Sequence, residues 1–297
     1  MNKVLVVGSV GYDTIETARG RRDDILGGSA VYFSLAARLL APVAIVGVVG
    51  EDFRKSDVDL FKNAGIDTTC LQTVSGGKTF RWHGKYRADM NVRDTVSVSL
   101  NVLGDFKPRL PQTHVRTPYV FLANGSTEMQ LSVLEQVKPA KSKVYFDTMD
   151  LWINTSRDGV IELLKRADGA VLNDSEAMAL SGKTSIVAAG RELIRMGAKC
   201  VIVKKGEHGS IAFTGDKTLL VPAYPLEEVF DPTGAGDSYA GALMGALAAG
   251  KSLHDAVMAA SVTASFTCES FGIERLVTLT VKDVKARLKT FSAMICR

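Results

Sequence analysis

The chain has 297 residues, of which 46% are hydrophobic and 23% charged, a composition that is ordinary for a soluble globular enzyme. The formal net charge is only +4, and the one basic cluster, at residues 19–22, is short, so the sequence gives little support for nucleic-acid binding. No apolar run approaches the ~20 residues that cross a bilayer, and the N-terminal stretch indicates a first strand, not a signal peptide. The cysteines lie far apart without metal-ligand spacing, which argues against a zinc site and a disulfide framework: Cys70, Cys200, Cys268 and Cys296. We therefore expect a cytoplasmic protein that binds neither nucleic acid nor a membrane.

Short apolar runs alternate with helical patterns along most of the chain. The runs predict strands buried on both faces, at residues 4–7, 44–46, 119–123, 144–146, 170–172 and 201–203. Helical patterns lie between them, at residues 29–40, 58–64, 128–137, 158–166 and 185–196. This alternation predicts a doubly wound α/β fold, in which helices flank both faces of a mostly parallel sheet.

Two segments, at about residues 14–26 and 78–103, interrupt the alternation. The first has alternating polarity around a turn at Arg19 and Gly20. Within the second, residues 79–86 and 94–103 show the period-two pattern of antiparallel strands. These segments form either a small functional sheet or surface hairpins without a role. The chain has no clear linker, so we predict that residues 1–297 form a single domain that carries both segments.

Polar residues follow several of the predicted strands. Asp13 comes after the first strand, and Asn124, Asp147 and Asn173 come after later ones. Because ligands in such folds bind beyond the carboxyl ends of the strands, we expect these side chains to crowd one edge of the sheet. Asp13 can accept two hydrogen bonds from vicinal hydroxyls of a sugar. Asn124 and Asp147 either reach the same substrate or only cap their loops.

The C-terminal third of the chain is predicted to be helical. Gly241 and Gly245 lie one turn apart on one helix face, which would allow close approach to a neighbouring helix. Helices are also predicted at residues 254–268 and 281–291, the second with Thr280 and Asp283 in a capping pattern.

The most informative stretch is Asp-Pro-Thr-Gly-Ala-Gly-Asp at residues 231–237, directly before a helix-forming segment. Small residues let backbone N–H groups close around an anion, and a helix N-terminus adds partial positive charge there. Asp237 then stands beside a phosphate-sized pocket, placed to take a proton from an attacking hydroxyl. This stretch resembles the C-terminal signature of the PfkB/ribokinase family of sugar and nucleoside kinases. We therefore interpret the chain as a phosphotransferase.

The resemblance extends over nearly the whole chain and implies a ribokinase-like fold in which the two additional segments form a β-sheet lid over the sugar site. It implies ATP-dependent phosphorylation of a hydroxymethyl group, with Asp237 as the base. The N–H groups of Gly234, Ala235 and Gly236 would hold the transferred phosphate, and Mg²⁺ would bridge the ATP oxygens.

Weaker resemblances extend this assignment to both substrates. Gly27 and Gly28 resemble the family's N-terminal di-glycine, where the backbone approaches the substrate, and Asp13 matches its sugar-binding aspartate. The chain departs from the family at residues 31–33, where Tyr32 lies near a position that usually carries asparagine. This departure puts in doubt which substrate hydroxyl is recognised.

Two further motifs resemble the nucleotide side of the family site. Asn173 and Glu176 fit its Asn-x-x-Glu motif, which positions ATP phosphates and, through bound water, magnesium; the same residues also indicate an ordinary helix start. Lys205, Gly206 and Gly209 resemble the loop that lies against the nucleotide, which is also compatible with a hairpin turn.

Family members often carry a potassium-type ion beside the anion hole, and the resemblance would place the carbonyls of Asp231 and Thr233 near it. We favour a small sugar as the acceptor, with a nucleoside of the adenosine-kinase type as the alternative, since Phe80, Trp82 and Tyr86 could stack on a base. A sensor without catalysis is the third hypothesis, and the intact Asp237 argues against it. We also predict a homodimer formed through the lid.

Overall fold

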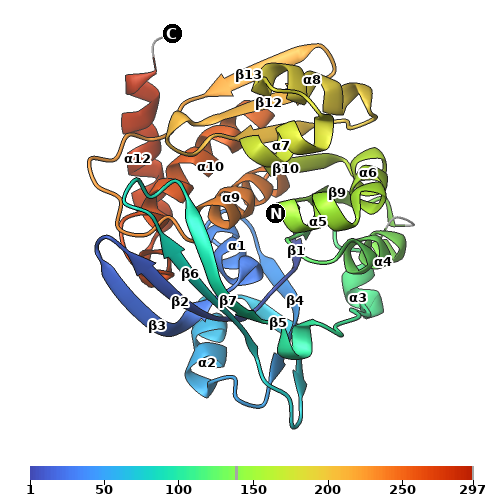
Figure 1. The fold of residues 1–297 in the computed structure, drawn as a ribbon, viewed down its shortest axis with the longest axis vertical. Coiled ribbons are helices and arrows are strands. Elements are labelled where there is room, and N and C mark those ends of the chain that lie inside the picture. The colour runs from blue at the N-terminus through green and yellow to red at the C-terminus, as the bar shows by residue number, and fades with distance from the viewer. Residues whose placement is uncertain (138–139, 296–297) are drawn as a thin grey trace.

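The computed structural model describes residues 1–137 and 140–295, which form two β-sheets and the helices that cover the larger sheet (Figure 1). The larger sheet has nine strands in the order β13-β12-β11-β10-β9-β8-β1-β4-β5. Their bounds are β1 Val4–Val7, β4 Val43–Gly50, β5 Asp67–Val74, β8 Tyr119–Leu122, β9 Lys143–Phe146, β10 Gly169–Asn173, β11 Val201–Lys204, β12 Ser210–Thr214 and β13 Lys217–Val221.

The strands from β11 to β5 pair in parallel, and β12 and β13 add an antiparallel edge. The central strands are apolar throughout because helices cover both of their faces, so that neither face of the pleat meets water. The mostly parallel, doubly wound fold predicted from the sequence is therefore confirmed.

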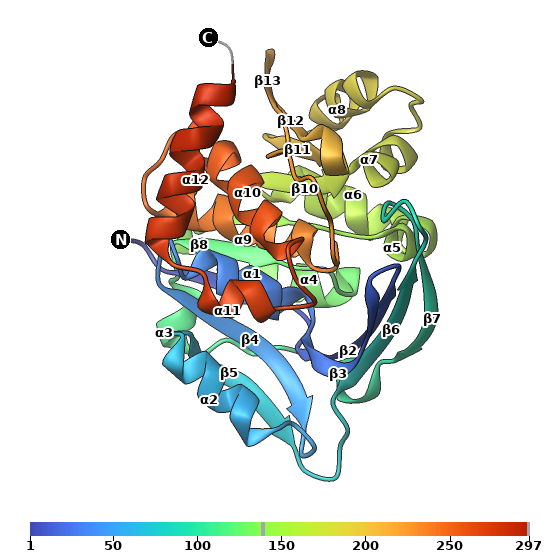
Figure 2. The ribbon, with the colours of Figure 1, turned by 90° about the vertical axis from the view of Figure 1, so that its left-hand side faces the viewer.

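The larger sheet divides the hydrophobic core into two layers, and helices cover the layer on each face (Figure 2). The core on one face includes residues of α1, α2 and α9 to α12, and the core on the other includes residues of α4 to α8. Their bounds are α1 Ser29–Ala37, α2 Lys55–Asn63, α3 Gln112–Val115, α4 Thr127–Val137, α5 Asp150–Thr155, α6 Arg157–Arg166, α7 Asp174–Ser181, α8 Ile186–Arg195, α9 Ala235–Ala248, α10 Leu253–Thr267, α11 Glu274–Thr278 and α12 Val281–Met294. In the described residues, no helix combines the length and the hydrophobicity needed to cross a membrane.

The smaller sheet has four strands in the order β3-β2-β6-β7, and projects from the body as the predicted lid (Figure 2). Its strands are β2 Gly11–Thr17, β3 Gly20–Gly27, β6 Phe80–Tyr86 and β7 Arg93–Ser99. Each of the two segments forms an antiparallel hairpin, but the hairpins meet through β2 and β6, which pair in parallel. The lid is therefore a mixed sheet.

Several boundaries differ from the sequence-based predictions. The first lid strand begins at Gly11, so Asp13 lies within β2 instead of in a loop after β1. The last lid strand ends at Ser99, and a short 3-10 helix, Asn101–Leu103, follows it. Strands β5 and β13 were not predicted, because each lies at an edge of the sheet with polar or exposed residues instead of an apolar run.

Two helical predictions are confirmed in detail. Thr280 and Asp283 form a reciprocal capping box at the start of α12. A Cβ on Gly241 would lie 2.2 Å from the carbonyl oxygen of Phe33, and one on Gly245 would lie 3.0 Å from that of Ala37. Only glycine lets α9 pack this closely on α1, and this packing sets Gly234 of the signature against the ring of Tyr32 in α1.

Candidate active site

The signature residues form a tight turn that leads into α9. Gly234 is the N-cap residue with a φ of 75°, in the left-handed region that favours glycine. The first N–H groups of a helix have no partner within the helix, and they point out of its N-terminus. The Ala235 N–H also donates to the carbonyl of Pro232 at 3.1 Å, which closes the turn. The arrangement is suited to an anion at the N-terminus of a helix of 14 residues.

Asp231 holds this turn against the loop before α11. Its carboxylate is fully buried, and accepts the N–H of Thr233 at 2.9 Å and the N–H of Gly272 at 2.8 Å. Burial raises the pKa of Asp231, and these hydrogen bonds oppose the rise. The Thr233 hydroxyl donates to the Tyr86 hydroxyl of the lid at 3.1 Å. Asp231 and Thr233 thus connect the signature to two other parts of the chain.

Asp237 lies in the first turn of α9 and is half-buried. Burial raises the pKa of its carboxyl to about 6, while the positive charges of Lys204 and Arg93 oppose the rise. A base with a pKa near 6 is ionised at neutral pH and is close to the range that favours general base catalysis. The environment of Asp237 therefore suits the predicted proton transfer.

Two more carboxyl groups lie close enough to interact with this centre electrostatically. Asp147 follows β9, and its Oδ1 is buried without a hydrogen-bond partner among the described residues. Burial raises the pKa of Asp147 well above its usual range, and the negative charge of Asp237 adds to the rise. Burial also raises the pKa of Glu176, and Lys204 again opposes the shift. The structure thus brings three acidic side chains and one lysine to the same edge of the sheet.

The acceptor-side residues meet where β2 pairs with β3. Asp13 is 4% exposed, and a Cβ on Gly27 would lie 2.0 Å from its Oδ2, so a side chain at residue 27 would displace the carboxylate. Gly28 has a φ of 100° and is the N-cap residue of α1. Burial raises the pKa of Asp13 to about 7, and the negative charges of Asp231 and Asp237 add to it, so these predicted residues share one region.

Tyr32, which occupies the position of the family departure, lies beneath the signature turn. A Cβ on Gly234 would lie 2.2 Å from its ring, and its hydroxyl is buried without a hydrogen-bond partner among the described residues. The aromatic ring of Tyr32 therefore packs directly against Gly234 in the signature turn.

Asn124 follows β8, and its side chain is engaged within the protein. It accepts a hydrogen bond from the Trp152 indole at 3.1 Å and contacts the Met149 sulfur at 3.2 Å. These bonds fit the loop-capping role that we left open for Asn124.

The nucleotide-side residues lie at the ends of β10 and β11. Asn173 and Glu176 form a reciprocal capping box at the start of α7, with both bonds at 2.7 Å. The helix-start interpretation of these residues is therefore confirmed. The Lys205 N–H donates to the Gly209 carbonyl at 2.7 Å, which closes a tight turn over Gly206.

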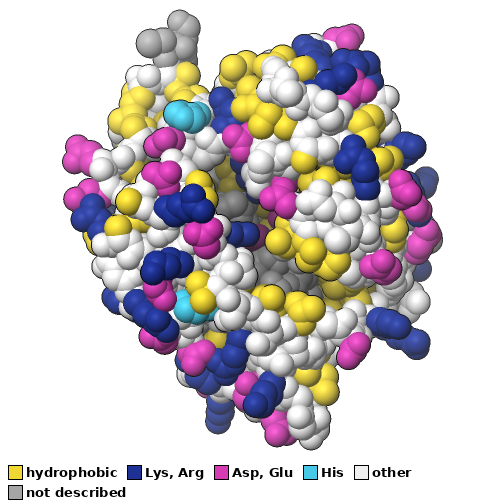
Figure 3. All heavy atoms as spheres, in the orientation of Figure 1, with side chains coloured by type: hydrophobic (Ala, Val, Ile, Leu, Met, Phe, Trp, Pro, Cys, Tyr) yellow, Lys and Arg dark blue, Asp and Glu magenta, His cyan; other side chains and the backbone are white. Residues whose placement is uncertain are grey.

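The lid reaches across the site to this turn. A Cβ on Gly206 would lie 3.8 Å from the side-chain oxygen of Asn91, which lies between β6 and β7. Figure 3 shows that this face of the molecule is hollowed at its middle, beside the lid. The lid hairpin thus extends from the acceptor side to the predicted nucleotide loop.

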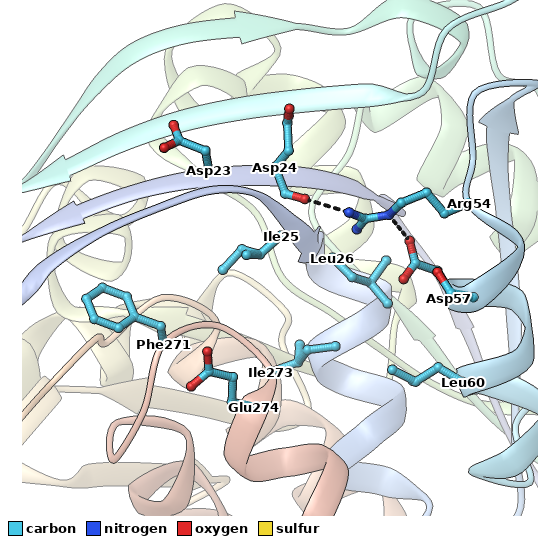
Figure 4. A pocket seen from close by; sticks show the side chains of 11 residues that line it. Asp23, Asp24, Ile25, Leu26, Arg54, Asp57, Leu60, Phe271, Ile273 and Glu274 are labelled. Carbon is cyan, nitrogen blue, oxygen red and sulfur yellow. Dashed lines mark hydrogen bonds and ion pairs between the residues drawn. The ribbon is translucent and has the colours of Figure 1, made fainter.

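A separate pocket of about 340 Å³ lies between β3, α2 and the loop before α11 (Figure 4). Arg54 crosses it, donating to the Asp24 carbonyl at 3.1 Å and to the Asp57 carboxylate at 2.8 Å. None of the predicted site residues lines this pocket. It lies at the base of the lid, away from Asp237.

The sequence matches the model of the pfkB family of carbohydrate kinases over residues 1–277. The chain belongs to this family. It is therefore an ATP-dependent phosphotransferase, as the signature predicted.

Among the pfkB-family relatives, a cytidine kinase of Thermococcus kodakarensis is 29% identical over 262 residues, which cover 86% of this chain and 92% of the relative. A nucleoside kinase of Methanocaldococcus jannaschii is 26% identical over 234 residues, covering 77% of this chain and 74% of the relative. The solved structure of a ribokinase II from E. coli in complex with ATP and Mg²⁺ superposes with a TM-score of 0.85 at 19% identity, over 98% of this chain and 100% of that chain. This last likeness confirms the ribokinase-like fold.

Sequence reasoning missed two cations of this pfkB-family site. Lys204 ends β11, and its position directly after a buried apolar strand was the signal that could have found it. Arg93 begins β7, opposite Tyr86, and lies over the Trp82 ring at 5.3 Å. No sequence pattern marks Arg93, because only the pairing of the lid strands turns it toward the carboxylates.

Proposed function

We propose that this pfkB-family kinase transfers the γ-phosphoryl group of ATP to the hydroxymethyl group of a nucleoside. The initial preference for a simple sugar gives way to the alternative, since relatives over most of the chain are named cytidine kinase and nucleoside kinase. A sugar and a nucleoside offer the same type of acceptor oxygen, because a nucleoside presents the hydroxymethyl group of its ribose.

A row of side chains across the lid supports a nucleoside as the acceptor. Asp13, Trp82 and Val98 are directly paired on β2, β6 and β7. Directly paired residues point to the same face of a sheet, so Trp82 and Val98 share the face of the sugar-binding Asp13. Val98 is 54% exposed although apolar. A sugar held by Asp13 would direct its base toward this apolar surface.

The three aromatic residues considered for stacking are not equivalent. Tyr86 is 9% exposed, and its hydroxyl accepts a hydrogen bond from Thr233, so it packs the lid against the signature. Trp82 is partly exposed, its indole N–H donates to Thr95 at 3.3 Å, and its ring lies over Gly84, where a Cβ would stand 1.9 Å from it. We therefore assign base stacking to Trp82.

The chemistry that we propose uses the groups around the N-terminus of α9. The Asp237 carboxylate accepts the proton of the acceptor hydroxyl as that oxygen attacks phosphorus. The N–H groups of Gly234, Ala235 and Gly236 stabilise the charge on the transferred group, and the Ala235 N–H is shared between that group and the Pro232 carbonyl. Such charge stabilisation is the main catalytic contribution in phosphoryl transfer. Asn173 and the loop that contains Lys205, described above, are proposed to position ATP.

Mg²⁺ bound with ATP would supply charge neutralisation at the phosphates. The described residues contain no group of three or more His, Cys, Asp or Glu side chains that could hold a metal. This fits Mg²⁺, which usually binds through one or two carboxylates together with phosphate oxygens and water. The oxygens of Glu176 and Asp147 are ligands of the correct hard type, and both groups interact electrostatically with Lys204 at the same edge of the sheet.

A monovalent cation beside the signature turn is part of the proposal. Both carboxylate oxygens of Asp231 are used by backbone N–H groups, so a K⁺ ion beside the turn would depend on the carbonyls of Asp231 and Thr233.

The predicted homodimer has one supporting observation. Strand β7 is an outer strand of the lid, and all seven of its residues are exposed. An open strand edge can pair with a second copy of the chain. Analytical ultracentrifugation of the wild type would detect a dimer, and a monomer at all concentrations would reject it.

The test of the nucleoside assignment measures ADP release with a panel of nucleosides and free sugars. We expect a nucleoside to give the highest kcat/KM. Trp82→Ala should raise KM for that nucleoside by about 5- to 150-fold, the equivalent of about 1–3 kcal/mol for one stacked base, while KM for ribose stays unchanged. Lys85→Ala, on the same strand but the opposite face, is the matched control. A free sugar that exceeds every nucleoside would refute the assignment.

A further inference from the structure

Lys204 lies against the N-terminus of α9, with three carboxyl groups at longer range. It is the last residue of β11, paired with Asn173 of β10. Its ammonium nitrogen lies 3.0 Å from the point where a Cβ on Gly236 would stand, so it rests against the first turn of α9. The N-terminus of a helix carries partial positive charge, which repels a cation. Lys204 therefore faces a positive helix end at short range.

The carboxylates nearby do not neutralise this ammonium by direct contact. Among the described residues, Lys204 has no ion pair with an N–O distance of 4.0 Å or less. Asp237, Asp147 and Glu176 interact with Lys204 only through longer-range electrostatics. A half-buried lysine and a helix N-terminus that point at the same space together form a binding site for an anion.

We infer that Lys204 is a catalytic residue that binds the oxygens of the transferred γ-phosphoryl group through its ammonium group. The inference rests on the proposed ATP-dependent transfer and adds to it a residue that the family resemblance did not assign. Lys204 precedes the Lys205 turn and faces Gly236, so it lies between the predicted nucleotide loop and the catalytic Asp237.

In the proposed step, the acceptor oxygen forms a bond to the γ-phosphorus while the bond from that phosphorus to the β–γ bridging oxygen breaks. ADP leaves with the electron pair of the broken bond, and the acceptor proton passes to Asp237. Negative charge on the transferred group is then shared between the N–H groups of α9 on one side and Lys204 on the other. An ammonium already in place needs no reorganisation as that charge develops.

The first test separates γ-phosphate contact from general nucleotide binding. Isothermal titration calorimetry with Mg²⁺ would compare the affinity of ADP with that of AMP-PNP, which carries a third phosphate group. For Lys204→Met we expect AMP-PNP affinity to fall at least about tenfold, as for loss of a charge-assisted bond, and ADP affinity to stay within about threefold. Lys199→Met, beyond the other end of β11 and paired with Asp168, is the control that should change neither.

The second test follows turnover and its pH dependence with the best acceptor of the panel. Lys204→Met should lower kcat by about 10²–10³-fold, and Lys204→Arg should restore part of it. The acidic limb of the kcat/KM profile should move to higher pH, because Lys204 holds down the pKa of Asp237. A lysine that acts only on the pKa of Asp237 would move this limb and leave the affinity for AMP-PNP unchanged, so the two tests together identify the phosphate contact.

The outcomes distinguish this inference from the kinase assignment. If the wild type binds neither nucleotide, the proposed function fails. If the wild type binds both and Lys204→Met loses ADP and AMP-PNP affinity equally, or keeps kcat within about threefold, the role of Lys204 is refuted. Should Lys204→Met not fold, Lys204→Gln and Lys204→Arg provide the same comparison.

Discussion

Replacing Asp237 by asparagine tests the proposed mechanism at its centre. Asparagine keeps the shape of the side chain and can still bond the acceptor hydroxyl, but it has no useful basicity. A positioned base contributes about 10²–10⁴-fold in rate, so kcat should fall within that range. The nucleotide-binding groups remain in place, and the affinity for ADP should change little.

The stability of the Asp237→Asn variant follows from the surroundings of the carboxyl. Burial raises its pKa from 3.8 to about 6. Folding therefore favours the protonated form, so stability falls as pH rises from 3.8 to about 6 and stays at the lower level above that. Each pKa unit corresponds to about 1.4 kcal/mol, so the penalty at pH 8 is on the order of 3 kcal/mol. The variant has no carboxyl to ionise, and should melt at the same temperature as the wild type or higher at pH 8.

The assay combines coupled ADP release with thermal melting, and uses Asp231→Asn as the matched control. Asp231 accepts two backbone N–H groups while fully buried, and an amide can accept only one of them. We expect Asp231→Asn to lose about 1–3 kcal/mol of stability but less turnover than Asp237→Asn. Near-normal kcat in folded Asp237→Asn would refute the base assignment.

Three further predictions concern the acceptor site, the lid and the cation. Asp13, with a pKa of about 7, is ionised only above that pH, so KM for the acceptor should rise as pH falls below 7, and a flat KM profile in steady-state kinetics would contradict its role. Hydrogen exchange at β6 should slow when ATP and acceptor are both added, whereas β2, held by a Thr17 bond to the Phe230 carbonyl at 3.1 Å, should change less; equal exchange with and without ligands would indicate a static lid. Replacing Na⁺ by K⁺ should raise kcat or lower KM for ATP if a cation lies beside Asp231 and Thr233, and identical kinetics in both salts would remove that site.

The nature of the reaction could be predicted from the sequence because its decisive features are local. The run of small residues at 231–237, followed by a helix, predicts an anion-binding turn directly beside Asp237, the proposed base. The capping boxes at Asn173 and Thr280 are equally local, since each joins residues three positions apart. Apolar runs of three to five residues likewise predicted the buried central strands, which water reaches on neither face.

Only the tertiary structure decided which groups surround that turn. Edge strands β5 and β13 carry polar residues and lack an apolar run that would predict a strand. They are strands because they pair with β4 and β12. The parallel pairing of β2 with β6 joins two segments more than 50 residues apart and puts Asp13 and Trp82 on one face. Arg93 reaches the electrostatic environment of Asp237 because its hairpin strand β7 pairs with β6, which β2 in turn joins to the rest of the lid. Lys204 lies against Gly236 because the end of β11 meets the first turn of α9. Such contacts depend on the path of the whole chain, which no local pattern encodes.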